Sequence, residues 1–193
     1  MLSELVANHR VLISVGSGGV GKTTVSAALA LWAAREGARA LVLTVDPARR
    51  LASALGLESF SEEERVIDDA TLDRAGIRLK GRLTAAMLDT KSTFDRVIGR
   101  YAATPELRDH ILASPFYRQA STAFPGSQEY MALEKLYEIR EERARDFDLV
   151  VLDTPPSHHV LDFLTAPARM QGLFDSRAFR TFSRTLTTLG KGP

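Results

Sequence analysis

The chain has 193 residues, of which 45% are hydrophobic and 25% charged, which is the composition of an ordinary globular domain with a sizeable core. Lys and Arg number 25 against 24 Asp and Glu, so the strongly basic charge typical of a nucleic-acid-binding protein is excluded. The sequence has no cysteine for a disulfide or a thiolate metal site. No apolar run approaches the roughly 18 residues of a membrane span and the N-terminus lacks a signal-peptide pattern, so we expect a cytoplasmic protein.

The first predicted element is a short strand followed by a glycine-rich loop. Residues 11–15 form an apolar, β-branched run, which is typical of a buried parallel strand. Residues 16–23 then fit the pattern G-x-x-x-x-G-K-[ST] of a phosphate-binding loop. In such a loop, backbone N–H groups bind a polyphosphate, the lysine reaches its β- and γ-phosphates and the hydroxyl binds Mg²⁺. The predicted phosphate-binding residues are Gly18, Gly19, Val20, Gly21, Lys22, Thr23 and Thr24.

A helix is predicted directly after this loop. Val25, Leu29 and Trp32 recur at helical spacing with alanines between them, and Gly37 stands where a helix C-cap belongs. The positive end of the helix dipole then faces the loop and favours an anion there.

The glycines of the loop are predicted to have separate roles. Gly16 and Gly21 bound the turn, whereas Gly18 and Gly19 are expected to have positive φ, which lets the backbone curve around phosphate oxygens. The alternative is a glycine-rich turn that binds no ligand.

A second buried strand is predicted over residues 40–45, and Asp46-Pro47 follows it. An acid at the carboxyl end of a strand lies at the edge where open α/β sheets bind ligands. Alternatively, Asp46 caps the next helix, with Pro47 at its first position. That helix is predicted over residues 48–57.

The middle of the chain gives weaker patterns. The polar residues 61–69 are interpreted as the solvated start of a helix, and residues 77–80 alternate as a half-exposed strand does. Residues 83–88 predict another strand, after which Asp89, Thr90 and Ser92 favour a helix start.

Short helices are expected between the prolines at 105, 115 and 125, followed by an amphipathic helix over residues 128–145. On that helix Tyr130, Leu133 and Tyr137 line one side, with Met131 and Leu136 nearby. We interpret this apolar stripe as core packing rather than as a groove for a partner.

The second strong signal is the run of hydrophobic residues that ends in Asp153. A carboxylate at the end of such a strand is typical of the Walker B arrangement, in which it holds Mg²⁺ directly or through water. Residues 154–157 have turn chemistry and are a candidate segment for sensing the γ-phosphate. His158 and His159 are adjacent, about 100° apart on a helix, so surface or packing roles are expected for them rather than one shared metal.

Taken together, residues 18–24, 44–48, 125–129 and 153–159 resemble the ArsA/Get3 family of anion-transporting and protein-targeting ATPases. That family belongs to the deviant Walker A group, with the ParA/MinD and nitrogenase iron-protein relatives. The resemblance covers most of the chain and implies an α/β, three-layer P-loop NTPase fold with a mainly parallel sheet and helices on both faces. It further implies one such domain over residues 1–193, with a helical segment at residues 105–145.

The resemblance also implies roles for single residues, with ATP and Mg²⁺ as cofactors. Lys22 and Asp46 would be catalytic, Lys22 binding phosphates and Asp46 directing the attacking water, while Thr23 and Asp153 would hold the metal. The implied switch residues are Asp46, Pro47, Asp153, Thr154, Pro156 and His159. Family members work as dimers that open and close with the nucleotide.

Three departures from the family pattern matter. Ser17 stands where the family has a signature lysine that crosses the dimer interface, so this subunit either hydrolyses slowly or pairs with a lysine-bearing paralogue. Pro155 and His158 replace the usual Ala and Gly of the second switch, and Pro narrows the freedom of the backbone. The chain also ends before the further strands of the family, so we expect a fragment of a longer protein, incomplete at its C-terminus.

The leading hypothesis is therefore an ATP-binding, Mg²⁺-dependent ATPase of the ArsA/Get3 type that acts as a nucleotide-driven dimeric switch. One alternative is a catalytically weak, nucleotide-binding regulatory subunit of a heterodimer. The other is a ParA/MinD-like positioning ATPase. We expect no nucleic-acid partner and no transmembrane segment, and a peripheral membrane partner stays open. The absence of cysteine excludes an arsenite-type thiolate site or a Cys-based zinc clamp in these residues.

Overall fold

The computed structural model describes residues 4, 6, 8–45, 49–56, 64–73, 76–115, 117, 127–155 and 165. They fall into two compact units. The first unit, residues 1–89 and 135–160, contains the sheet. The second unit comprises residues 90–134 and 161–193, and its described elements are helices.

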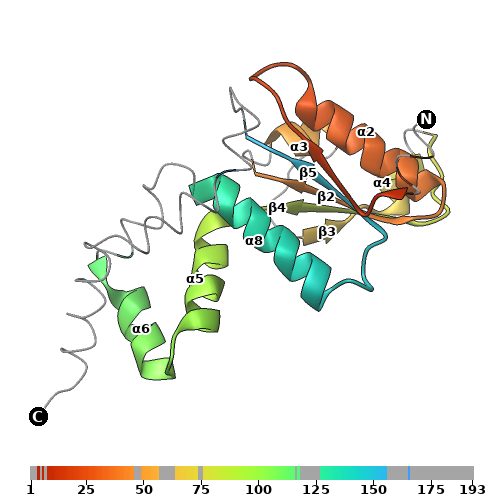
Figure 1. Cartoon of the computed structure of the whole chain (residues 1–193). Helices are drawn as coiled ribbons and strands as arrows, with labels where there is room; N and C mark the ends of the chain where they lie inside the picture. The colour runs from red at the N-terminus through yellow and green to blue at the C-terminus, as the bar shows by residue number, and fades with distance from the viewer. Residues whose placement is uncertain are drawn as a thin grey trace, which may run out of the picture. The chain divides into compact units, whose positions relative to one another are not determined.

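One sheet of five strands organises the first unit (Figure 1). Its order is β1-β5-β2-β4-β3, where the first four are parallel and β3 runs antiparallel to β4. The strands are β1 (Val11–Ser14), β2 (Arg39–Thr44), β3 (Glu64–Val66), β4 (Arg82–Met87) and β5 (Leu149–Asp153). The four predicted parallel strands are thus confirmed. All of β5, and all of β2 except Arg39, is buried, as expected of parallel strands covered on both faces.

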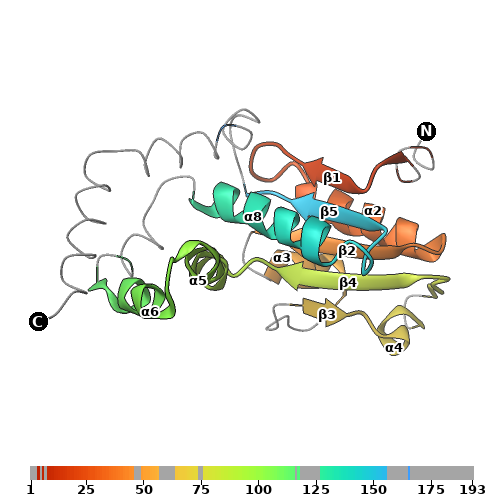
Figure 2. The same cartoon turned by 60° about the horizontal axis from the view of Figure 1, so that its bottom comes forward.

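Helices lie on both faces of this sheet. Figures 1 and 2 show α2 (Lys22–Arg35) on one face and, on the other, the part of α8 (Ser127–Glu142) that belongs to this unit. The short helices α3 (Arg49–Ala54) and α4 (Asp69–Asp73) complete the described elements of this unit. This arrangement confirms the predicted α/β class with a mainly parallel sheet.

Helix α2 packs against β2 and β5 through small side chains. Ala27, Ala30, Ala33 and Ala34 are each at most 3% exposed, whereas Val25 is 52% exposed. The spacing of Val25, Leu29 and Trp32 therefore predicted the helix but not its buried face. Alanine on that face lets the helix backbone approach the sheet closely, which places the first turn of α2 beside the ends of the central strands.

Two predictions for the middle of the chain were wrong. Residues 64–66, interpreted as part of a helix start, form strand β3, and the helix α4 begins only at Asp69. Residues 77–80, predicted as a strand, have no regular structure and lead into β4. The prediction for α8 also needs correction, because its buried apolar residues are Met131, Ala132, Leu136 and Ile139, whereas Tyr137 is 55% exposed.

In the helical unit, the short helix expected between Pro105 and Pro115 is confirmed, while residues 118–126 lie outside the described residues. The described elements of this unit are α5 (Thr90–Tyr101), α6 (Pro105–Ala113) and the start of α8. Helix α6 has Pro105 at its first position, and the Thr104 hydroxyl caps it by accepting a hydrogen bond from the backbone N–H of Leu107.

Two ionic contacts connect the segment between α8 and β5 to the sheet. Asp148 accepts hydrogen bonds from the Arg39 backbone N–H, Nε and Nη2 at 2.9, 3.0 and 2.6 Å, and Arg39 Nη1 also donates to the Arg145 carbonyl oxygen. Arg143 donates to both carboxylate oxygens of Glu64, at 2.6 and 3.0 Å. These contacts lie at the amino-terminal end of the parallel strands or next to β3.

Candidate functional site

The glycine-rich loop leads from β1 directly into α2. Gly19 and Gly21 have φ of 81° and 86°, a region that side chains with a Cβ rarely adopt. Gly18 does not have positive φ, so that part of the prediction was wrong. Gly21 occupies the N-cap position of α2 and offers no side-chain cap, and no acid stands in the first turn. The first N–H groups of α2 are thus left without a capping side chain, as an anion site requires.

A pocket of about 590 Å³ opens beside this loop, within the first unit. Its lining residues are Gly19, Gly21, Lys22, Thr23, Thr24, Arg50, Ser53, Ala54 and Thr154. Among the described residues of this lining, two are cations, four carry hydroxyl groups and none is acidic. This composition fits a polyanion and disfavours a cationic ligand.

Lys22 lies over the loop itself. Its Nζ donates a hydrogen bond to the backbone carbonyl oxygen of Ser17 at 2.9 Å. The side chain of Ser17 is not part of this contact, so position 17 contributes only its backbone here.

Behind the pocket, one buried carboxylate joins three elements. Asp153 Oδ2 accepts hydrogen bonds from Thr23 Oγ1 at 2.7 Å and from Thr44 Oγ1 at 3.0 Å. Asp153 is only 1% exposed, and the strand register places Thr44 directly beside it. A carboxylate and a hydroxyl in contact supply the hard oxygen ligands that Mg²⁺ prefers, so Thr23 and Asp153 fit the predicted metal site chemically.

Thr154 connects the end of β5 to the start of the loop. Its backbone N–H and its Oγ1 both donate to the carbonyl oxygen of Ser14, at 3.3 and 2.7 Å. Thr154 also lines the pocket, so this one residue contacts both the pocket and the end of β1.

The structure brings together Lys22, Thr23, Asp153 and Thr154 of the predicted site. The predicted residues Asp46, Pro47, Pro156 and His159 lie outside the described residues, as do Ala48 and His158.

Sequence reasoning missed three residues, Thr44, Arg50 and Ser53. Thr44 could have been found as the one hydroxyl in an otherwise apolar strand, and Arg50 and Ser53 by their helical spacing after Asp46.

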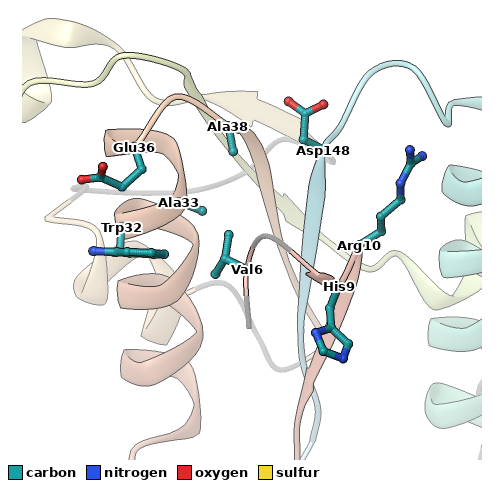
Figure 3. Close-up of a pocket in the computed structure, with 8 residues that line it drawn as sticks. All are labelled: Val6, His9, Arg10, Trp32, Ala33, Glu36, Ala38 and Asp148. Atoms are coloured by element: carbon teal, nitrogen blue, oxygen red, sulfur yellow. The ribbon is translucent and has the colours of Figure 1, made fainter. Parts of the chain in front are cut away.

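A second hollow, of about 540 Å³, lies at the amino-terminal end of the strands (Figure 3). Its lining residues are Val6, His9, Arg10, Trp32, Ala33, Glu36, Ala38 and Asp148. Figure 3 shows the Glu36 carboxylate and the Arg10 guanidinium on opposite sides of Val6, pointing away from it. Because the Glu36 carboxylate points away from Arg10 and Asp148 is held by Arg39, we assign no ligand to this hollow.

Within the described parts of the chain, no three His, Asp or Glu side chains gather as a metal cluster. Over the same residues, none of the helices combines the length and apolarity needed to traverse a bilayer.

Comparison with known proteins agrees with this geometry. The sequence profile described as anion-transporting ATPase matches residues 9–190. The chain is 30% identical over 173 residues to the ATPase GET3 of Malassezia globosa, covering 89% of this chain and 46% of that protein. It is 31% identical over 170 residues to a Halobacterium salinarum protein whose name describes an arsenical pump-driving ATPase, and the match covers 88% of this chain and 26% of that protein. The ATPase get3 of Schizosaccharomyces japonicus is 28% identical over 156 residues, and the match covers 81% of this chain and 43% of that protein. The chain thus spans less than half the length of each of these relatives.

Proposed function

Because the chain belongs to the anion-transporting ATPase family, which includes ArsA- and Get3-type ATPases, we propose that it binds ATP with Mg²⁺, hydrolyses it and acts as a nucleotide-driven dimeric switch. The observation that carries this proposal is the pocket whose described lining has two cations and no acid, placed beside the contact between Thr23 and Asp153. The family profile extends over both compact units, so we assign both to one P-loop ATPase domain.

In this proposal the phosphates bind at the loop and the first turn of α2, where backbone N–H groups and the helix dipole favour anions. Lys22 exchanges its hydrogen bond with the Ser17 carbonyl for contacts with the β- and γ-phosphates. Thr23 and Asp153 would hold Mg²⁺, which supplies positive charge against the phosphate oxygens as they become more negative.

The water-directing role is assigned to Asp46 from the family resemblance. Asp46 and Pro47 would form the first switch, and Asp153, Thr154, Pro156 and His159 the second. The contacts of Thr154 with Ser14 support the second assignment, because they connect the start of that segment to the loop. A switch of this kind acts by ordering a segment when the γ-phosphate is present.

The test is Mg²⁺-dependent phosphate release from ATP and GTP, with nucleotide binding measured on the same samples. Lys22→Ala is expected to abolish both binding and release. Asp46→Asn is expected to keep binding and lose release, because it removes only the group that directs water. Arg35→Gln, an exposed cation in the last turn of α2, is the charge-matched control. Nucleotide binding that does not depend on Lys22 would contradict the proposal.

Ser17 favours a second candidate function, a nucleotide-binding regulatory subunit that hydrolyses ATP only with a lysine-bearing paralogue. Its hydroxyl cannot supply the charge of the family's signature lysine, and only its carbonyl contacts Lys22. Ser17→Lys is then expected to raise phosphate release by the lone chain. Unchanged release in both the lone chain and a co-purified complex would exclude this candidate. Light scattering with and without ATP tests the proposed dimer in the same samples.

A further inference from the structure

We propose that Arg50 is a second phosphate-binding cation, which contacts the terminal phosphate and lets the pocket distinguish ATP from ADP. This inference rests on the proposed ATPase function. Nothing in the loop pattern points to Arg50, which belongs to α3 rather than to the loop.

The charge of the pocket is the first argument. A terminal phosphate carries about −1.5 to −2 charges near neutral pH. Among the described lining residues, the cations are Lys22 and Arg50, and they come from different helices. Beside Lys22 and the Mg²⁺ that Thr23 and Asp153 would hold, Arg50 adds a further positive charge for the terminal phosphate in the same pocket.

The position of Arg50 is the second argument. Helix α3 follows the carboxyl end of β2, and Thr154 follows the neighbouring carboxyl end of β5, where the register pairs Thr44 with Asp153. Arg50 and Thr154 therefore line the pocket on the side of the Thr23 and Asp153 oxygens. Thr23 and Asp153 would hold Mg²⁺ against the outer phosphates, so a cation on this side would meet the outer end of a triphosphate.

The shape of this wall is the third argument. Arg50 is exposed at the pocket, and the next turn of α3 presents the short side chains Ser53 and Ala54. Such short side chains leave room for a phosphate group beside the guanidinium. A guanidinium donates two parallel hydrogen bonds to phosphate oxygens, which an ammonium group cannot do with the same geometry.

The experiment measures dissociation constants, in Mg²⁺, for ADP and a non-hydrolysable ATP analogue. Arg50→Gln is expected to weaken binding of the analogue about tenfold, the loss typical of one charged hydrogen-bonding group, and to weaken ADP less than about threefold. Arg50→Lys keeps the positive charge but loses the two parallel donor groups of the guanidinium. Its dissociation constant for the analogue is therefore expected to lie between those of the wild type and Arg50→Gln. Arg35→Gln makes the same charge change about 20 Å from the start of α2 and is expected to change neither constant.

The results separate the two proposals. If the wild type binds nucleotide through Lys22, and Arg50→Gln has the same dissociation constants as Arg35→Gln, the inference about Arg50 is wrong and the proposed function stands. Equal losses for ADP and the analogue would also overturn the assignment to the terminal phosphate. If the wild type binds neither nucleotide, both proposals fail. Should Arg50→Gln not show the wild-type thermal transition, the selective loss of the analogue in Arg50→Lys decides the question.

Discussion

The two ends of strand β5 each carry an aspartate, and the two carboxylates are held in opposite ways. Asp148, just before the strand, is half exposed and accepts three hydrogen bonds from Arg39, one of them from the backbone. Asp153, the last residue of the strand, is buried, and the donors seen at its Oδ2 are the neutral hydroxyls of Thr23 and Thr44.

This difference separates a structural role from a chemical one. The guanidinium of Arg39 neutralises Asp148, and its hydrogen bonds lower the pKa of that carboxyl to about 2. Hydroxyl donors orient Asp153 without cancelling its charge, so the carboxylate can still attract a metal cation. We therefore expect substitutions at the amino-terminal end of β5 to change the free energy of unfolding, and substitutions at its carboxyl end to change phosphate release.

The largest effect is expected for Asp153→Asn, which keeps the shape of the side chain and removes its charge. Phosphate release from ATP should fall more than about 100-fold, because the metal loses its carboxylate. The free energy of unfolding should fall by no more than about 1 kcal/mol, since a neutral side chain is less costly to bury. Steady-state phosphate release tests the expected loss of activity, and urea unfolding of the same samples tests the expected change in stability. Near-normal release would refute the role of Asp153.

The next effect is on stability and concerns Gly81, at the amino-terminal end of β4. Its backbone N–H donates to the Ala34 carbonyl at 2.9 Å, and a Cβ on Gly81 would overlap the Ala38 carbonyl oxygen. Gly81→Ala should therefore lower the free energy of unfolding by about 3 kcal/mol. Gly99→Ala is the matched control, because the helical Gly99 has space for a Cβ and alanine favours helix by about 0.5–1 kcal/mol. Equal unfolding midpoints for both variants would contradict this prediction.

Local patterns predicted most of the sheet. The apolar runs that became β2, β4 and β5 are buried on both faces, so each strand carries its own signal in the sequence. The contact between Thr23 and Asp153 could also be predicted from the sequence, because a P-loop hydroxyl and the acid at the end of a buried strand meet in the expected fold.

The failures depend on partners that are distant in the sequence. Strand β3 has only three residues, two of them charged, and Glu64 pairs with Arg143, 79 residues away. No local periodicity distinguishes such a short edge strand from a helix start. Arg50 is brought to the pocket by the packing of α3 beside α2, and the helical spacing after Asp46 is the one local sign of it.

A smaller effect on phosphate release is expected for substitutions of Thr44, and it tests whether the hydroxyl donors orient Asp153. Thr44→Val keeps the shape but removes one hydrogen bond to Asp153, so release should fall about tenfold and stability by about 1 kcal/mol. Thr44→Ser keeps the hydroxyl and should retain most of the release. Titration with Mg²⁺ checks the cause, because a poorly oriented carboxylate should need more Mg²⁺ for half-maximal release. An unchanged Mg²⁺ dependence in Thr44→Val would mean that Thr44 does not orient Asp153.

The smallest effect is expected for Asp148→Asn at the other end of β5. The pair with Arg39 is 45% and 49% exposed, so its loss should cost less than about 1 kcal/mol near pH 7 and leave phosphate release unchanged. Because folding lowers the pKa of Asp148 from 3.8 to about 2, its contribution is fully present above pH 3.8 and is lost as the pH falls through 2. Urea unfolding of both proteins from pH 7 to pH 3 should therefore show a difference that shrinks only below about pH 4. Asp73→Asn, at an exposed carboxylate of α4, controls for the change in net charge. A difference that persists unchanged to pH 3 would mean that Asp148 acts through the hydrogen bonds it accepts rather than through its charge, and the contrast with Asp153 would then not be one of charge.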